Sequence, residues 1–173
     1  EIFQLWAECL KRVDGSRFMF VRPEAGAPTF CSNVRRHFEA HGVSGDRIDF
    51  VAVRGKHKPH YNRIDIALDT APQTGGTTTC ETLWMGVPTV TLVGEAFFER
   101  LSYSNLSNAG LGDLCAFTRG QYVDIAVDLA ADRERRLDLR HGLRQRLRTL
   151  PLGDAKRWVR NFEAQILHVT GRA

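Results

Sequence analysis

The sequence predicts an α/β protein built on a doubly wound parallel sheet, with extra helices in its C-terminal part. Up to residue 93, short apolar segments of strand character alternate with amphipathic segments of helical period. This alternation is typical of parallel strands covered by helices on both faces. After residue 94 the pattern is mostly helical. With 173 residues and 43% hydrophobic content the chain suits one core, so we expect a single domain over 1–173.

Periodicity and turn residues give the elements in order. The first segment repeats apolar residues at helical spacing, the second helix closes on a glycine, and Pro88 follows the third. These patterns predict helices at 1–13, 29–42, 77–86, 97–110, 121–132, 134–150 and 155–169. Strands are predicted at 17–22, 47–53, 64–70 and 87–93, a loop or short helix at 57–63, and a possible short edge strand at 114–118. Because they stand on apolar helix faces, three tryptophans are expected in the core: Trp6, Trp84 and Trp158.

Composition excludes several classes of protein. The four cysteines stand far apart, so neither a disulfide framework nor a zinc site is indicated, and no carboxylate pair has metal-binding spacing. The separated cysteines also lead us to expect a reducing, cytoplasmic setting. No run of 18 apolar residues or signal-like start occurs, so we expect neither membrane insertion nor export. The charge of +4 is partly concentrated in 133–148, which we interpret as an amphipathic helix with a solvated basic face. An RNA-binding face on this helix is the alternative, although exposed aromatic residues are lacking.

A turn rich in small residues joins the third strand to the third helix. Gly75 and Gly76 would let backbone approach a ligand, while Thr77 and Thr78 would add hydroxyl donors at a helix N-terminus. Such an end attracts phosphate through its unpaired N–H groups. Glu81, one turn later, would face the same opening and could accept two sugar hydroxyls. The spacing therefore fits a nucleotide site, and a purely structural helix cap fits it equally well.

Other motifs narrow the chemistry. The P-loop and GxGxxG patterns are absent, as is GxSxG, so ATPase, dinucleotide oxidoreductase and hydrolase chemistry have no support. Asp69 at the strand end is expected to hold the glycine turn by accepting backbone N–H bonds rather than to act as a catalytic base. Glu95, at the next strand end, is a weaker candidate for a ligand contact. His57 lies in a basic loop, RGKHKPHYNR, which composition alone would leave solvated.

The stretch LDTAPQTGGTTTCETLWMGVPTVTLVG resembles the donor-binding half of the O-GlcNAc transferase and SPINDLY family of protein O-glycosyltransferases. The likeness continues through NAGLGDL and QYVDIAVDLAAD, and upstream through DRIDF and LWAECLKRV. It implies that the chain is the Rossmann-like C-terminal half of a GT-B glycosyltransferase. The start inside a helix, without Met, also leads us to expect a fragment of a longer protein.

The resemblance assigns roles to individual residues. His57 matches a histidine beside the nucleobase, and the backbone from Ala52 to Arg54 matches the segment that pairs with the base edge. Glu81 matches an acidic residue at the ribose. Gly75, Gly76, Thr77 and Thr78 fall in the turn at the diphosphate. No catalytic residue that deprotonates the acceptor is identified, and no metal site or further cofactor is expected.

One position departs from the family pattern. O-GlcNAc transferases carry His before the two threonines and SPINDLY-like proteins carry Thr, whereas this chain has Gly76. The donor, UDP-GlcNAc or GDP-fucose, is therefore left open.

The resemblance implies an inverting, metal-independent transfer of GlcNAc or fucose from a nucleoside diphosphate sugar to Ser or Thr of an acceptor protein. It also implies that an N-terminal half and tetratricopeptide repeats of the same chain complete the enzyme, and that the isolated residues have little activity. The alternative is a non-catalytic nucleotide-binding or protein-interaction module of the same fold. No nucleic-acid partner is expected.

Overall fold

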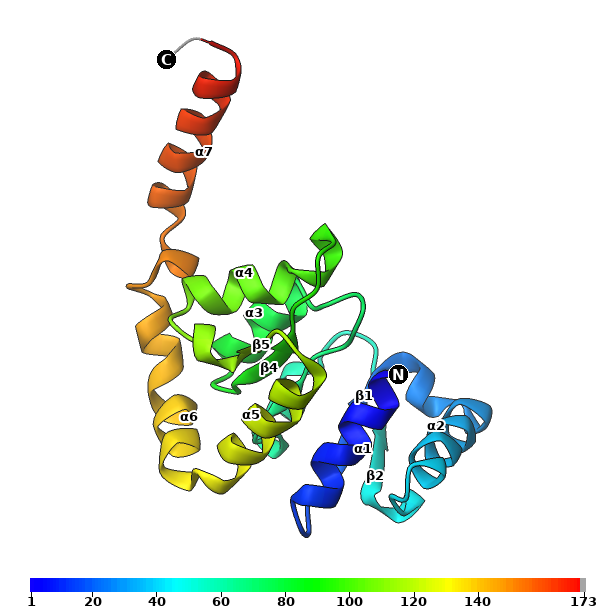
Figure 1. The fold of residues 1–173 in the computed structure, drawn as a ribbon. Helices are drawn as coiled ribbons and strands as arrows, with labels where there is room; N and C mark the ends of the chain where they lie inside the picture. Colours follow the sequence, from blue (N-terminus) through cyan, green and yellow to red (C-terminus); the bar gives the residue numbers. More distant parts are fainter. Residues whose placement is uncertain (172–173) are drawn as a thin grey trace.

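The computed structural model describes residues 1–171 and shows an α/β architecture with parallel strands (Figure 1). β1 (Phe18–Val21) pairs with β2 (Ile48–Val51), and β4 (Thr89–Leu92) lies between β3 (Ala67–Leu68) and β5 (Cys115–Ala116). Every pairing is parallel. The predicted class is therefore confirmed, and 114–118 does supply an edge strand. The strands form two sheets, however, and not one continuous sheet.

The strand predicted at 64–70 is much shorter than expected because its first residues are bonded elsewhere. The Ile64 N–H donates to the carbonyl of Tyr61, and the Ile64 carbonyl accepts from the Arg140 guanidinium. The Ala67 N–H donates to the carbonyl of Pro88, just before β4, at 2.8 Å, and the Asp69 N–H donates to the carbonyl of Val90 in β4 at 2.9 Å. The ladder therefore covers two residues, and the segment before it is free to form the 3₁₀ turn η3 (Lys58–Arg63).

The helices follow the sequence pattern with one break. Their bounds are α1 (Ile2–Arg12), α2 (Pro28–Ala40), α3 (Thr77–Trp84), α4 (Leu101–Asn108), α5 (Arg119–Ala131), α6 (Arg133–Leu147) and α7 (Ala155–Val169). The single helix predicted at 97–110 is divided into the 3₁₀ turn η4 (Phe97–Glu99) and α4. The Glu99 carboxylate accepts the Ala96 N–H at 2.8 Å, which holds η4 as a separate turn.

Aromatic rings fill the space around β1 and β2. Phe20 stacks on Phe50 with centroids 5.8 Å apart, and the rings of Phe18 and Phe38 lie 5.5 Å apart. Trp6 of α1 joins this cluster and is 4% exposed. α1 also packs against α5, so it connects the first sheet to the second (Figure 1).

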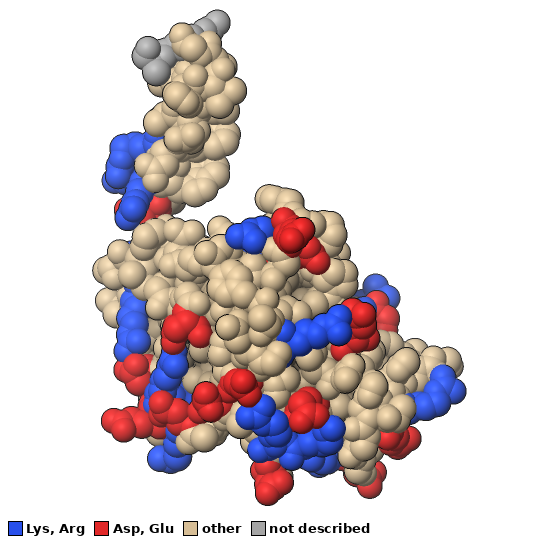
Figure 2. Space-filling model, viewed as in Figure 1, with Lys and Arg blue, Asp and Glu red and all other residues tan. Residues whose placement is uncertain are grey.

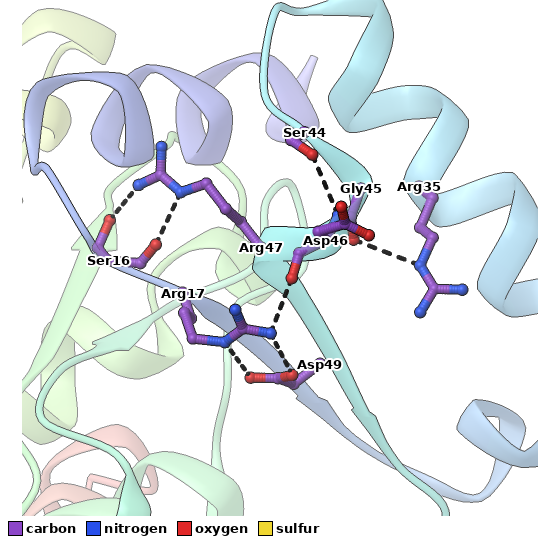
Figure 3. Close-up of polar contacts among 8 residues, drawn as sticks. All are labelled: Ser16, Arg17, Arg35, Ser44, Gly45, Asp46, Arg47 and Asp49. Carbon is purple, nitrogen blue, oxygen red and sulfur yellow. Dashed lines mark hydrogen bonds and ion pairs between the residues drawn. The ribbon is translucent and has the colours of Figure 1, made fainter.

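A half-buried arginine, Arg47, ties the segment before β2 to the end of α1, and Figure 3 shows its bonds to Ser16. The Arg47 guanidinium donates to the carbonyls of Leu10, Val13 and Ser16 at 2.7, 3.1 and 2.8 Å. These carbonyls lie at and just beyond the end of α1, where helical backbone acceptors lack intrahelical partners. The Arg47 cation, just before β2, therefore satisfies backbone acceptors at the end of α1 and in the turn that follows it.

Two of the three tryptophans are not in the core, contrary to the prediction. Trp84 is 41% exposed, and the guanidinium groups of Arg144 and Arg148 lie over its ring. Trp158 is 62% exposed and stacks on Phe162, with centroids 5.1 Å apart. Trp158 is exposed because α7 extends away from the rest of the structure and has no buried residue (Figure 1). An apolar helix face predicts burial only when another element covers it.

α6 is amphipathic, as the sequence indicates, with Leu139, Leu143 and Leu147 buried. Its basic face is not simply solvated, because Arg140 and Arg144 donate to backbone carbonyls of neighbouring segments. The face drawn in Figure 2 mixes acidic and basic side chains and shows no single basic patch. Within residues 1–171, no helix is long and apolar enough to cross a membrane.

Candidate functional site

A pocket of about 270 Å³ lies where the carboxyl end of β1 faces the amino end of α3. The segment after β2 and the turn η3 complete its wall. Its lining brings together residues far apart in the sequence: Val21, Arg22, Pro23, Val53, Gly55, His57, His60, Tyr61, Ile64, Thr78 and Glu81. Three predicted site residues, His57, Thr78 and Glu81, therefore share one pocket.

The Glu81 carboxylate is the polar centre of this pocket. Its Oε2 lies 2.8 Å from His57 Nε2, and its Oε1 lies 3.7 Å from Lys58 Nζ. The side chains of His57 and Glu81 are 34% and 28% exposed, so both remain accessible to a ligand. A carboxylate has roughly four acceptor sites. Glu81 can thus hold His57 and still accept hydroxyl groups.

The wall behind His57 was not identified from the sequence. Tyr61 is 9% exposed, and its ring meets the His57 ring edge-on at 6.0 Å. Burial raises the pKa of the Tyr61 hydroxyl, so it stays neutral at physiological pH. The Arg140 guanidinium donates to the Tyr61 carbonyl at 3.1 Å and so fixes η3 from outside. Tyr61 lies four residues after His57 in the same loop and could have been suspected. Arg140, 79 residues from Tyr61, gave no signal in the sequence.

The two glycines of the turn have different surroundings. A Cβ on Gly75 would lie 2.5 Å from Thr79 Oγ1, so this position requires glycine for close packing. A Cβ on Gly76 would meet only Leu101 Cδ1, at 3.9 Å. The Gly76 carbonyl accepts the Asn105 side-chain amide at 3.0 Å. The position that departs from the family pattern therefore has room for a side chain.

The amino end of α3 carries no side-chain cap. Gly76 is the N-cap residue and has no side chain that could accept an N–H group of the first turn. Thr77 and Thr78 are both exposed, and Thr78 lines the pocket. The structural alternative, a threonine and glutamate capping pair, is thus not what these residues form. Unpaired N–H groups at a helix N-terminus attract anions.

Other predicted residues lie as follows. Asp69 accepts N–H bonds from Thr70 and Gly75, which confirms its expected role in holding the turn. Burial raises the pKa of the Asp69 carboxyl, and hydrogen bonds from the turn and from Thr91 oppose this. Ala52 and Arg54 are exposed, but the pocket is lined by their neighbours Val53 and Gly55. Glu95 is exposed and does not line the pocket.

A metal site is not formed by the residues that the structure describes. Within 1–171, no group of three or more His, Cys, Asp or Glu side chains could hold a metal ion. All four cysteines are free, and burial raises the pKa of Cys9 to about 12. Burial also raises the pKa of Cys115, to about 11, so these two buried thiols pack as small apolar groups.

Comparison with known proteins gives consistent matches. Residues 1–162 match the model of glycosyl transferase family 41. The chain is 35% identical to a probable UDP-N-acetylglucosamine–peptide N-acetylglucosaminyltransferase SPINDLY of Hordeum vulgare, over 95% of this chain and 18% of that protein. It is also 35% identical to the corresponding SEC protein of Arabidopsis thaliana, over 99% of this chain and 18% of that protein.

A solved structure agrees with these matches. A mutant O-GlcNAc transferase of Thermobaculum terrenum superposes with a TM-score of 0.82 and 36% identity, covering 89% of this chain and 30% of that one. The chain spans less than a fifth of the length of the SPINDLY and SEC proteins that it matches.

Proposed function

Because the chain belongs to glycosyl transferase family 41, we propose that it forms the donor-binding half of a protein O-glycosyltransferase. The carrying observation is that His57, Thr78 and Glu81, spread over 25 positions of the sequence, line one pocket at the uncapped end of α3. In open α/β sheets, ligands bind where strand carboxyl ends meet helix amino ends. The donor is a nucleoside diphosphate sugar.

Each part of the pocket suits one part of such a donor. His57, backed by Tyr61, offers a flat ring beside the nucleobase, and Val53 and Gly55 line the same pocket. The free acceptor sites of Glu81 suit the two ribose hydroxyls. Thr77 and Thr78, together with the N–H groups of the first turn of α3, suit the diphosphate.

The chemistry proposed for this half is stabilisation of the leaving group. The acceptor hydroxyl attacks the anomeric carbon with inversion, and the nucleoside diphosphate departs carrying the negative charge. Hydroxyl and amide donors that are already aimed at the diphosphate stabilise this charge in the transition state. We propose that this suffices without a metal ion. The group that deprotonates the acceptor is not identified.

The transferred sugar is GlcNAc or fucose, delivered from UDP-GlcNAc or GDP-fucose to Ser or Thr of an acceptor protein. The open space beside Gly76 favours neither donor, since no side chain projects there.

The other partners that we propose are segments of the same protein outside residues 1–173. An N-terminal half and tetratricopeptide repeats of the same protein would face the pocket and bring the acceptor. The free, widely spaced cysteines suit a reducing compartment, and we propose the cytoplasm.

Titration calorimetry with UDP and GDP, followed by transfer assays with the full-length protein, tests the proposal. Binding of one nucleotide, with transfer of its sugar to protein, is the expected result. Binding with neither transfer nor donor hydrolysis would instead indicate a non-catalytic module. Indifference to both nucleotides, together with steeply salt-dependent RNA binding, would show the RNA-binding alternative.

A further inference from the structure

The turn from residue 69 to 76 is backed by buried polar side chains, which are costly unless they are hydrogen-bonded. The buried Asp, Ser and Thr side chains of residues 1–171 are Asp69, Thr74, Thr79, Thr82, Thr89, Thr91 and Ser102. Most of them bond to this turn or to a group that holds it. Such a concentration indicates that the backbone geometry of the turn matters.

One carboxylate oxygen closes the turn. Asp69 Oδ1 accepts the N–H groups of both Thr70 and Gly75, each at 3.0 Å. The other oxygen, Oδ2, accepts the Thr91 hydroxyl of β4 at 2.7 Å. The Asp69 side chain is therefore held by a rigid strand on one side and holds both ends of the turn on the other.

Further bonds fix the same backbone from neighbouring helices. The Gly75 carbonyl accepts the Ser102 hydroxyl of α4 at 2.7 Å, so both polar groups of Gly75 are bound by buried side chains. The Asp69 carbonyl accepts the Tyr122 hydroxyl of α5 at 3.0 Å. The Tyr122 hydroxyl in turn accepts the Trp6 indole N–H of α1 at 3.2 Å.

We propose that Asp69 is a positioning residue for the donor site. By clamping Gly75 against β4, it sets the direction in which the first N–H groups of α3 and the hydroxyls of Thr77 and Thr78 point. Its own charge faces the turn and Thr91 rather than the pocket, so it does not contact the donor. This inference rests on the proposed function, since it needs a diphosphate at this helix end. Donors held in place beforehand bind an anion without an ordering cost.

The chain offers a matched pair of substitutions as a test. Thr91 and Thr89 lie two residues apart on β4, and both are buried. The Thr91 hydroxyl donates to Asp69, whereas the Thr89 hydroxyl has no partner among the described residues. Thr91→Val and Thr89→Val therefore make the same change of shape, and only the first removes support from Asp69.

Two measurements are made on each variant of the full-length protein. The rate of hydrogen exchange at the Gly75 amide reports how often its bond to Asp69 opens, and calorimetry gives the Kd for UDP and GDP. We expect Thr91→Val to speed exchange at Gly75 roughly tenfold and to weaken nucleotide binding roughly fivefold. Thr89→Val should leave both values as in the wild-type protein. Equal exchange rates and equal Kd values in the two variants would overturn the inference.

A second pair separates positioning from general stability. Asp69→Asn keeps an oxygen that can accept the Gly75 N–H, so exchange and Kd should stay within about threefold of wild type. Asp69→Ala removes both acceptors and should weaken binding at least about tenfold where it folds. Loss of affinity in Asp69→Asn equal to that in Asp69→Ala would also contradict the proposal. If the wild-type protein binds neither nucleotide, the proposed function fails, while the exchange rates still decide whether Asp69 holds the turn.

Discussion

The two sheets of the structure are stabilised in different ways. Around β1 and β2 the interior is aromatic, with contacts among Phe18, Phe20, Phe38 and Phe50. Around β3, β4 and β5 the core is largely aliphatic, and every buried Asp, Ser and Thr side chain of residues 1–171 lies there. The burial of apolar surface is non-directional, whereas hydrogen bonds fix positions and angles.

This difference indicates which region contributes mainly to stability and which to ligand binding. The first half of the structure, around β1 and β2, contributes stability and supplies one apolar wall of the pocket, through Val21 and Pro23. The second half, around β3, β4 and β5, carries the turn at residues 69–76 and the uncapped amino end of α3, where the direction of each N–H matters. We therefore expect substitutions in the first half to change stability and substitutions in the second half to change ligand affinity.

The largest expected effect is on the aromatic cluster. Phe38→Ala removes a fully buried ring, and we expect the free energy of unfolding to fall by about 3–5 kcal/mol, because a cavity remains. Nucleotide affinity of the protein that stays folded should change little. Urea unfolding measures the loss. Phe97→Ala is the matched control, since Phe97 is 82% exposed, and its effect should stay within about 0.5 kcal/mol.

The next effect concerns affinity rather than stability. Replacing Thr77 and Thr78 together by Ala should weaken nucleoside diphosphate binding at least tenfold, or about 1.4 kcal/mol, because two hydroxyl donors are lost. Both side chains are exposed, so unfolding should be nearly unaffected. Calorimetry measures the change. Unchanged affinity in the folded double variant would show that the diphosphate does not bind at this helix end.

A pH dependence sharpens the contrast in the second half. Burial raises the pKa of Asp69 above its unfolded value of about 3.9, so stability is lost as pH rises through the folded pKa. Asp69→Asn cannot ionise. Its free energy of unfolding, relative to wild type, should therefore rise with pH above about 4 and then level off. Urea unfolding across this range measures the difference, and a constant difference would contradict the assigned burial effect.

The smallest expected effect lies in the first half. Hydrogen bonds from Arg17 lower the pKa of Asp49, so this pair stabilises the fold above the unfolded pKa and loses that contribution as pH falls through the folded pKa. The pair is partly exposed, and solvent screens it. Asp49→Asn should thus change the Tm only slightly at neutral pH. A loss approaching that of Phe38→Ala would show that polar contacts also dominate this half.

Much of this architecture could be predicted from local patterns. The strands at β1, β2 and β4 and the helices α1, α2, α3, α5 and α6 follow hydrophobic periodicity and turn residues. The short length of β3 could not be predicted, because the Ile64 carbonyl is bound by Arg140 from a helix far along the chain. The exposure of Trp158 could not be predicted from the sequence either. An apolar stripe shows that a face can be buried, and it does not show that another element covers it.

For the candidate site, the sequence by itself determined the chemistry of the turn: small residues, hydroxyls and a carboxylate at one strand-to-helix junction. It also placed His57 in a basic loop and linked both segments to a family. Only the tertiary structure decided that His57 and Glu81 meet at 2.8 Å, and that Asp69 is clamped between Thr91 and Gly75. The physical reason is that residue types follow from local sequence, while distances between separate segments follow from the packing of the whole chain.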